Sequence, residues 1–143
     1  MIELSDDKAR LQVGRVHAWL ASSYWSPGIT RALVERAIAG SHCLGAYRGA
    51  LQVGYARMVT DRATFGWLAD VWVDESSRGE GVGRAMVRWF IDHSDYADVR
   101  RLALVTRDAH GVYAGAGFRP LARPERYMER LAPEFARLLG AQP

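Results

Sequence analysis

Three strand-like segments follow one another in this chain with no room for a helix between them, and this constrains its fold most. Residues 41–47, 51–59 and 64–73 each have the pattern of a strand, and the last is rich in aromatic side chains. Turns at Arg48-Gly49 and at 60–62 separate them. Strands joined by such short turns pair antiparallel, because a parallel connection needs a crossover of about a dozen residues. The pattern excludes a purely parallel, doubly wound sheet.

Helix and strand signals alternate on both sides of this central meander. Thr30 is a good N-cap for a helix that Gly40 stops. The remaining segments predict a strand at 2–4, helices at 13–20, 84–93, 109–116 and 134–139, and strands at 101–106, 118–121 and 127–131. The later strand–helix–strand units imply at least one parallel pair. We therefore expect an α/β (α+β) fold with a mixed, mostly antiparallel sheet of six to seven strands and helices on both faces.

Length and charge narrow the class of protein. The 143 residues suit a single domain, 1–143, since the sequence has no linker, repeat or low-complexity run. The net charge of +3 comes from interleaved basic and acidic residues, which argues against a nucleic-acid-binding face.

No apolar stretch is long enough for a membrane span, and the acidic start is unlike a secretory signal, so we expect a cytoplasmic protein. Cys43 is the single cysteine and the histidines lack a metal-binding spacing, so no metal site is expected.

Residues 71–87 carry the chemistry of this sequence. They run from a strand through a glycine-rich loop into an amphipathic helix, with the loop pattern Arg78-x-x-Gly81-x-Gly83. Glycines let backbone N–H groups converge on an anion, and the following helix directs its positive end to the same point. With added charge from Arg84, the loop is predicted to bind a pyrophosphate, and a plain tight turn is the alternative. The Gly-Lys-Ser/Thr ending of a triphosphate loop is missing, and Met86 breaks the dinucleotide pattern.

The loop pattern resembles the coenzyme A loop of the GNAT acetyltransferase superfamily, whose motif is Arg/Gln-x-x-Gly-x-Gly/Ala. Residues 113–118 (Tyr-Ala-Gly-Ala-Gly-Phe) resemble a second family motif, Tyr-x-x-x-Gly-Phe. The likeness covers about residues 50–121 and extends more loosely to the two N-terminal helices. The stretches 23–25, 60–62 and 106–113 are similar to an uncharacterised bacterial branch of the family, which implies no particular substrate.

The resemblance implies an N-acetyltransferase that moves an acetyl group from acetyl-CoA directly to an amine of a small molecule or peptide, in a ternary complex. In the family, the strand before the loop pairs with the pantetheine arm, and the loop amides hold the pyrophosphate. This assigns cofactor binding to Val71, Trp72, Val73, Arg78, Gly79, Glu80, Gly81, Val82, Gly83 and Arg84. Similar proteins are often homodimers, and residues 127–139 are a candidate for such a contact.

The resemblance also implies catalytic residues. Tyr113 stands where family members carry the general acid that protonates the leaving thiolate. Asp70, on the strand beside the thioester, and His110 are candidate bases, although a water chain often replaces a single base in the family. The alternatives are that Asp70 is hydrogen-bonded to a neighbouring loop, that His110 caps or packs locally, and that Tyr113 packs on the cofactor without proton transfer. The candidate residues of the acceptor pocket are Tyr24, Trp25 and Trp67, with core packing as the alternative for each.

Two other functions fit the same loop. A non-catalytic acyl-CoA-binding module would keep the loop but lack a working acid and base. An acetylating toxin directed at aminoacyl-tRNA would need a face for RNA, which the interleaved charges do not favour. Release of free thiol that depends on an acceptor separates a transferase from a binding module.

Overall fold

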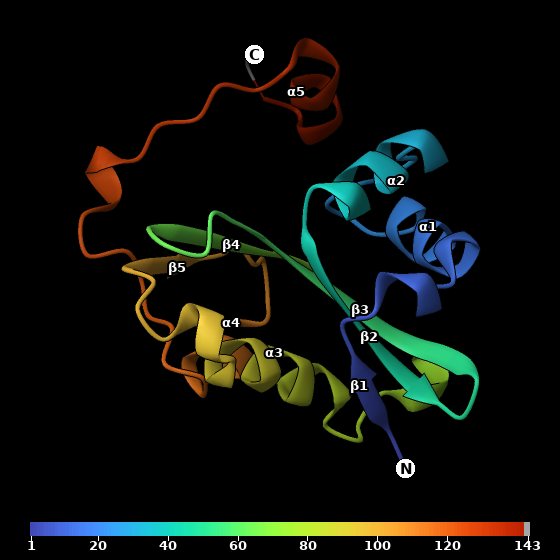
Figure 1. Ribbon diagram of the computed structural model, residues 1–143. Coiled ribbons are helices and arrows are strands. Elements are labelled where there is room, and N and C mark those ends of the chain that lie inside the picture. Colours follow the sequence, from blue (N-terminus) through green and yellow to red (C-terminus); the bar gives the residue numbers. More distant parts are fainter. Residues whose placement is uncertain (142–143) are drawn as a thin grey trace.

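The computed structural model describes residues 1–141 and contains one five-stranded sheet with the order β1-β2-β3-β4-β5 (Figure 1). The strands are β1 (Glu3–Ser5), β2 (His42–Arg48), β3 (Leu51–Thr60), β4 (Phe65–Val73) and β5 (Arg101–Ala103). The first four strands pair antiparallel, which confirms the predicted hairpins, and β4 pairs parallel with β5. The sheet is therefore mixed and mostly antiparallel, as expected from the sequence.

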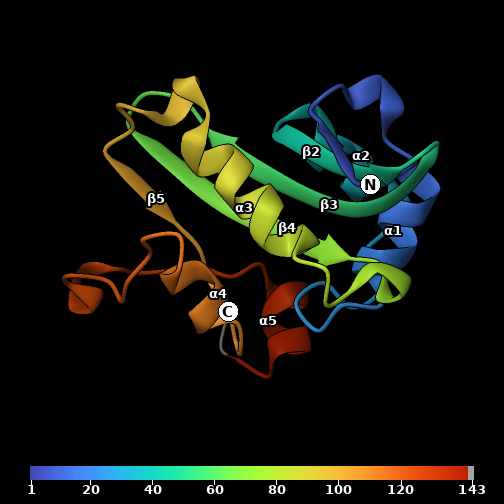
Figure 2. The same cartoon turned by 90° about the horizontal axis from the view of Figure 1, so that it is seen from below.

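Helices cover both faces of the sheet (Figures 1 and 2). They are α1 (Val13–Ala21), α2 (Arg31–Ala39), α3 (Val82–Asp92), α4 (His110–Ala114) and α5 (Pro133–Leu139), with 3₁₀ turns at residues 8–10, 75–77, 94–96 and 124–126. Helix α3 lies across one face, whereas α1 and α2 lie on the other. The Thr30 hydroxyl accepts from the Leu33 amide, so the predicted N-cap does start α2. No helix within residues 1–141 has the length and apolar character that a membrane span needs.

Each face of the sheet has its own hydrophobic core. Between α3 and the sheet, Met58, Leu68, Met86 and Phe90 are among the buried side chains. On the other face, the buried side chains are Val16, Trp19, Leu20, Val34, Ile38, Cys43 and Tyr55. Gly54 of β3 lets α3 approach closely, since a Cβ there would lie 3.2 Å from the Met86 methyl carbon. The two cores hold the sheet between the helices and place the end of β4 next to the start of α3.

The sixth and seventh strands expected from the sequence do not form in the described part of the chain. Residues 118–121 and 127–131 have no ladder partner and contain no buried residue, and the sheet ends at β5. Pro120 has no N–H to donate, and Gly117, with φ of 98°, turns the chain away after α4. An extended segment becomes a strand only where a neighbour supplies hydrogen bonds, so the count of six to seven strands is wrong.

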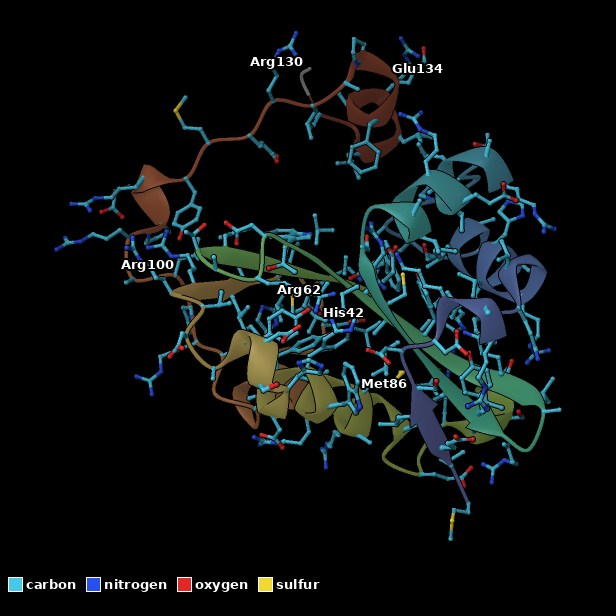
Figure 3. All side chains as sticks on the ribbon, in the orientation of Figure 1. His42, Arg62, Met86, Arg100, Arg130 and Glu134 are labelled. Carbon is cyan, nitrogen blue, oxygen red and sulfur yellow. The ribbon has the colours of Figure 1, made fainter. Side chains whose placement is uncertain are left out.

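A buried histidine ties β2 to the chain segments that flank it. The His42 Nδ1 lies 2.5 Å from the Tyr96 hydroxyl, and Nε2 lies 2.9 Å from the Asp6 carboxylate. Because a carboxylate only accepts, Nε2–H donates to Asp6, and the Tyr96 hydroxyl donates to Nδ1. Burial lowers the pKa of His42; contact with Asp6 opposes this shift, while the charges of Arg62 and His93 reinforce it. Figure 3 labels His42 and Arg62. The folded chain therefore favours the neutral ring.

Folding stability should fall as the pH drops below about 6.5, the ordinary pKa of histidine. In that range the unfolded chain takes up a proton on His42, whereas the folded chain resists protonation. We expect a lower urea midpoint at about pH 5.5 than at about pH 8, and a smaller difference in His42→Asn. The control is His110→Asn, because the exposed His110 should leave the wild-type difference intact. An equal pH effect in the His42 variant would contradict this role.

Candidate functional site

Strand β4 leaves part of one edge without a neighbouring strand. It pairs with β5 only over Phe65–Trp67, and β5 then ends at Ala103, short of the predicted end at residue 106. Strand β4 continues to Val73, so residues 68–73 present an open edge in the region that the structure describes (Figure 2). The free N–H and C=O groups of such an edge can pair with an extended ligand as they would with another strand.

The glycine loop follows directly after this open edge. The chain passes through the 3₁₀ turn at 75–77 into the loop, and α3 starts at Val82. Gly79 and Gly81 both have φ of 80°, a left-handed conformation that other residues rarely adopt. The backbone amides of residues 79–84 donate to no acceptor within residues 1–141. Free amides at the start of a helix attract anions, so the loop has the geometry that an anion site needs.

Two arginines hold the loop and the end of β4. Arg48 donates to the Glu80 carboxylate at 3.1 Å. Arg78 donates from Nε to the Val73 carbonyl at 2.9 Å, and its guanidinium lies 5.2 Å from the centroid of the Trp72 ring. Arg78 therefore folds back onto β4, so its charge lies beside the open edge.

A groove of about 550 Å³ lies between α3 and α4. Two arginines line it together with small and aliphatic residues; the full lining is Arg84, Ala85, Val87, Arg88, Gly111, Val112, Gly115 and Ala116. Arg84 belongs to the first turn of α3, so the groove adjoins the free amides of the loop. It offers positive charge to the part of a ligand that extends beyond an anion held at the loop.

A bulge in β4 places Asp70 in a buried ion pair. The register against β3 shifts between Tyr55 and Arg57, and Asp70 has φ of 57°. One Asp70 oxygen accepts from Arg57 Nε at 2.6 Å, and the other accepts from Trp25 Nε1 at 2.9 Å. The Asp70 side chain is 8% exposed. The structure thus brings the predicted Asp70 and Trp25 together and adds Arg57, which sequence analysis missed because the bulge creates the contact.

Aromatic rings pack beside this ion pair. The Trp25 ring centroid lies 5.9 Å from that of Trp72 and 5.0 Å from that of Tyr24. Burial raises the pKa of Tyr113 on α4, and the Tyr24 phenol raises it further. The predicted Tyr24 and Trp25 therefore lie beside Trp72 of β4, whereas Tyr113 packs against the core of the α3 face, as Val71 and Val73 of β4 do.

The two remaining predicted residues, Trp67 and His110, also have exposed side chains. Trp67 is 37% exposed and precedes Trp72 on β4 by roughly 16 Å of strand. His110 starts α4, and its side chain is exposed. Arg107 was not among the predicted site residues, yet its backbone N–H donates to the Tyr24 hydroxyl at 3.1 Å across 83 residues of sequence. No local pattern could have shown a contact over that separation.

The open edge of β4, the glycine loop at the start of α3 and the order of the elements define the GNAT class of acetyltransferases. Residues 39–120 match the family model of the acetyltransferase (GNAT) domain. That match covers more than half of the chain. The chain therefore belongs to the GNAT family, and it is an acetyltransferase.

Known relatives agree with this assignment. A predicted acetyltransferase from Gibberella zeae is 31% identical over 126 residues, which cover 73% of this chain and 71% of that protein. This chain also resembles the crystal structure of a predicted GNAT-family acetyltransferase from Xanthomonas campestris. The two chains superpose with a TM-score of 0.90 and are 40% identical, and the match covers 93% of this chain and 94% of the Xanthomonas chain. A predicted acetyltransferase from Clostridium acetobutylicum, crystallised with acetyl-CoA, shares the fold at a TM-score of 0.67 and 16% identity, over 92% of this chain and 96% of that one.

The left-handed conformation of the loop can be tested with two alanine substitutions. Gly81→Ala should destabilise the protein by about 1–2 kcal/mol, because φ of 80° is strained for any L side chain. Gly111→Ala is the matched control, since a Cβ meets open space at both positions but Gly111 lies within α4. It should be neutral or stabilise by up to about 1 kcal/mol. Urea denaturation measures both, and equal effects would contradict a requirement for the left-handed loop.

Proposed function

We propose that this chain transfers an acetyl group from acetyl-CoA directly to an amine of a small molecule or peptide, within a ternary complex. The observation that carries the proposal is the open edge of β4, which leads into the free amides of residues 79–84. An extended pantetheine arm has amide groups that pair with such an edge, and its pyrophosphate is the anion that suits the loop. Membership of the GNAT family supports this use of both features.

Each part of acetyl-CoA has a matching part of the site. The residues proposed to bind it are Val71, Trp72, Val73, Arg78, Gly79, Glu80, Gly81, Val82, Gly83 and Arg84. The absence of a side chain at Gly79 and Gly81 lets the pyrophosphate approach the loop backbone, since nothing stands within 4 Å of either Cβ position. The groove that contains Arg84 and Arg88 is proposed to accept the nucleotide end of the molecule.

In the proposed reaction the amine nitrogen attacks the thioester carbon, so a C–N bond forms and the C–S bond breaks. A backbone N–H near Val73 polarises the thioester carbonyl. Tyr113 donates its phenolic proton to the leaving sulfur, while the amine loses a proton to water. The raised pKa of Tyr113 keeps its phenol protonated at neutral pH, as a general acid requires.

Asp70 suits a positioning role better than the general base expected from the sequence. Its two oxygens accept from Arg57 and Trp25, so the carboxylate is already engaged on both sides. Through Trp25 it fixes the rings beside Trp72, where the acceptor amine is proposed to approach. Tyr24 and Trp25 then form the wall of the acceptor site, and the more distant Trp67 is left out of it.

Cys43 supports direct transfer rather than an acyl-cysteine route. It is the single cysteine of the chain and is 1% exposed. Burial raises the pKa of its thiol, so the thiolate that a nucleophile needs is disfavoured. A lone reduced thiol also suits the cytoplasm, which is the location we propose for the reaction.

Tyr113→Phe tests the proposed acid. It should lower kcat for acetyl-CoA-dependent thiol release by about 100-fold or more and leave the KM for acetyl-CoA within about twofold. Since burial raises the Tyr113 pKa above its usual value of about 10, the wild-type rate should show no loss from Tyr113 ionisation as the pH rises to about 9. Tyr127→Phe, at an exposed tyrosine, is the control. An unchanged kcat in Tyr113→Phe would remove Tyr113 from the chemistry.

We further propose that two copies of the chain associate through its C-terminal arm, residues 119–141, which ends with α5 (Figure 1). The exposed apolar side chains of the arm are Leu121, Tyr127, Met128, Phe135, Leu138 and Leu139. On the β3–β4 hairpin, Val59, Phe65 and Trp67 are also exposed. A two-fold axis lets the arm of each copy cover the hairpin of the other, so both apolar surfaces leave water together.

Light scattering after gel filtration tests this association. The expected mass is about twice the 15.9 kDa of one chain. The double variant Tyr127→Asp, Met128→Asp should shift the mass toward that of one chain, because a charge opposes burial of the arm. Val105→Asp is the control, since Val105 is 79% exposed and belongs to neither surface. A wild-type mass of one chain at all concentrations would refute the proposed dimer.

A further inference from the structure

Tyr24 and Arg107 form a bridge between the α1–α2 connection and the β5–α4 connection. The Arg107 backbone N–H donates to the Tyr24 hydroxyl at 3.1 Å. The Arg107 guanidinium carbon also lies 3.8 Å from the centroid of the Tyr24 ring, a cation–π contact. Backbone and side chain of one residue thus hold the same tyrosine, which fixes the guanidinium beside it.

This contact changes what the Tyr24 ring can recognise. An exposed aromatic ring in an acceptor pocket suits a cationic or apolar ligand, but here the chain itself supplies the cation. The Arg107 side chain is 68% exposed. Its ion-pair partner is the adjacent Asp108, at 3.5 Å and 69% exposed, and exposed pairs of this kind contribute little. The N–H groups of Arg107 are therefore available to a ligand.

The bridge joins the aromatic rings at the end of β4 to the segment that leads into α4. Tyr24 packs on Trp25, which packs on Trp72 at the open edge of β4. Arg107, which holds Tyr24, lies shortly before α4, the helix that carries Tyr113. The Asp70 carboxylate, which accepts from Trp25, is already paired with Arg57 at 2.6 Å. Arg107 therefore supplies positive charge beside Tyr24, opposed only by its weak, exposed pair with Asp108 within the described residues.

We propose that Arg107 binds a carboxylate or phosphate group of the acceptor, so that the preferred acceptor is an amine that also carries an anionic group. This inference rests on the proposed function and names the substrate class of the same site. The planar guanidinium fork matches the oxygens of either anion and binds them in pairs. Tyr24 holds the fork in place, so the anion orients the amine end of the acceptor toward Trp72 and Tyr113.

Matched pairs of amines test the proposal through acceptor-dependent thiol release from acetyl-CoA. The pairs are glycine with glycinamide, phenylalanine with phenylalaninamide, and phosphoethanolamine with ethanolamine, so that carboxylate and phosphate are tested separately. Rates are compared per unprotonated amine, because the anionic group also shifts the amine pKa. The anionic member of at least one pair should have a kcat/KM roughly tenfold or more above its partner, since hydrogen bonds to charged groups are strong.

Variants at Arg107 connect this preference to one side chain. Arg107→Gln should reduce the preference for the anionic amine to about twofold or less and leave the KM for acetyl-CoA unchanged. The backbone N–H of residue 107 still donates to Tyr24 in this variant, so the bridge is kept. Arg107→Lys should retain part of the preference, because the charge remains without the fork. Asp108→Asn is the matched control, since it removes the competing carboxylate and should keep or increase the preference.

The outcomes separate this inference from the proposed function. Equal rates within every pair, or a preference that survives Arg107→Gln, would overturn the role of Arg107 while the transferase stands. If no amine releases thiol, the proposed function fails. The melting temperature of the protein–CoA complex, measured with each of the same amines, then tests binding by Arg107 alone. If the anionic amines raise the melting temperature and Arg107→Gln abolishes this rise, the binding role of Arg107 is supported. Equal melting temperatures within every pair would overturn it.

Discussion

The short pairing between β4 and β5 is the constraint on which the rest of the site depends. The two strands run parallel over three matched positions and then separate, because β5 ends at Ala103 while β4 continues to Val73. The other edge of β4 is paired with β3, and α3 packs firmly beneath the sheet. Pairing with β3 and packing against α3 therefore support the open edge, although no strand of the described chain pairs with it. A strand edge that is already in place pairs with an extended ligand without first having to become ordered.

The bulge at Asp70 couples this edge to the aromatic rings of Trp25 and Trp72. It brings Asp70 within reach of Arg57 and Trp25, and Trp25 in turn packs on Trp72. A buried ion pair is costly to break, since removal of one partner leaves an unpaired charge. Its main effect here is to fix the position of the aromatic rings. In the proposed function, the same strand holds acetyl-CoA with its backbone and organises the acceptor wall with its side chains.

Local signals predicted most of the elements, and contacts distant in sequence account for what they missed. Thr30 caps α2 as expected because an N-cap bond joins neighbours in the chain. The glycine loop was likewise predictable, since left-handed Gly79 and Gly81 and the helix start lie in one short segment. Residues 127–131 resemble a strand locally, but whether they pair depends on a neighbour that the chain does not place beside them. The Tyr24–Arg107 bridge spans 83 residues and has no local signature.

Amide hydrogen exchange with and without acetyl-CoA tests whether the open edge of β4 and the glycine loop bind this molecule. We expect slower exchange at the amides of residues 71–73 and 79–84 when acetyl-CoA is bound, with little change in β1 and β2. NAD and ATP should not produce this pattern, since neither has a pantetheine arm to pair with β4. Protection that appears elsewhere, or no protection at those amides, would contradict the assignment of the open edge and the glycine loop to acetyl-CoA.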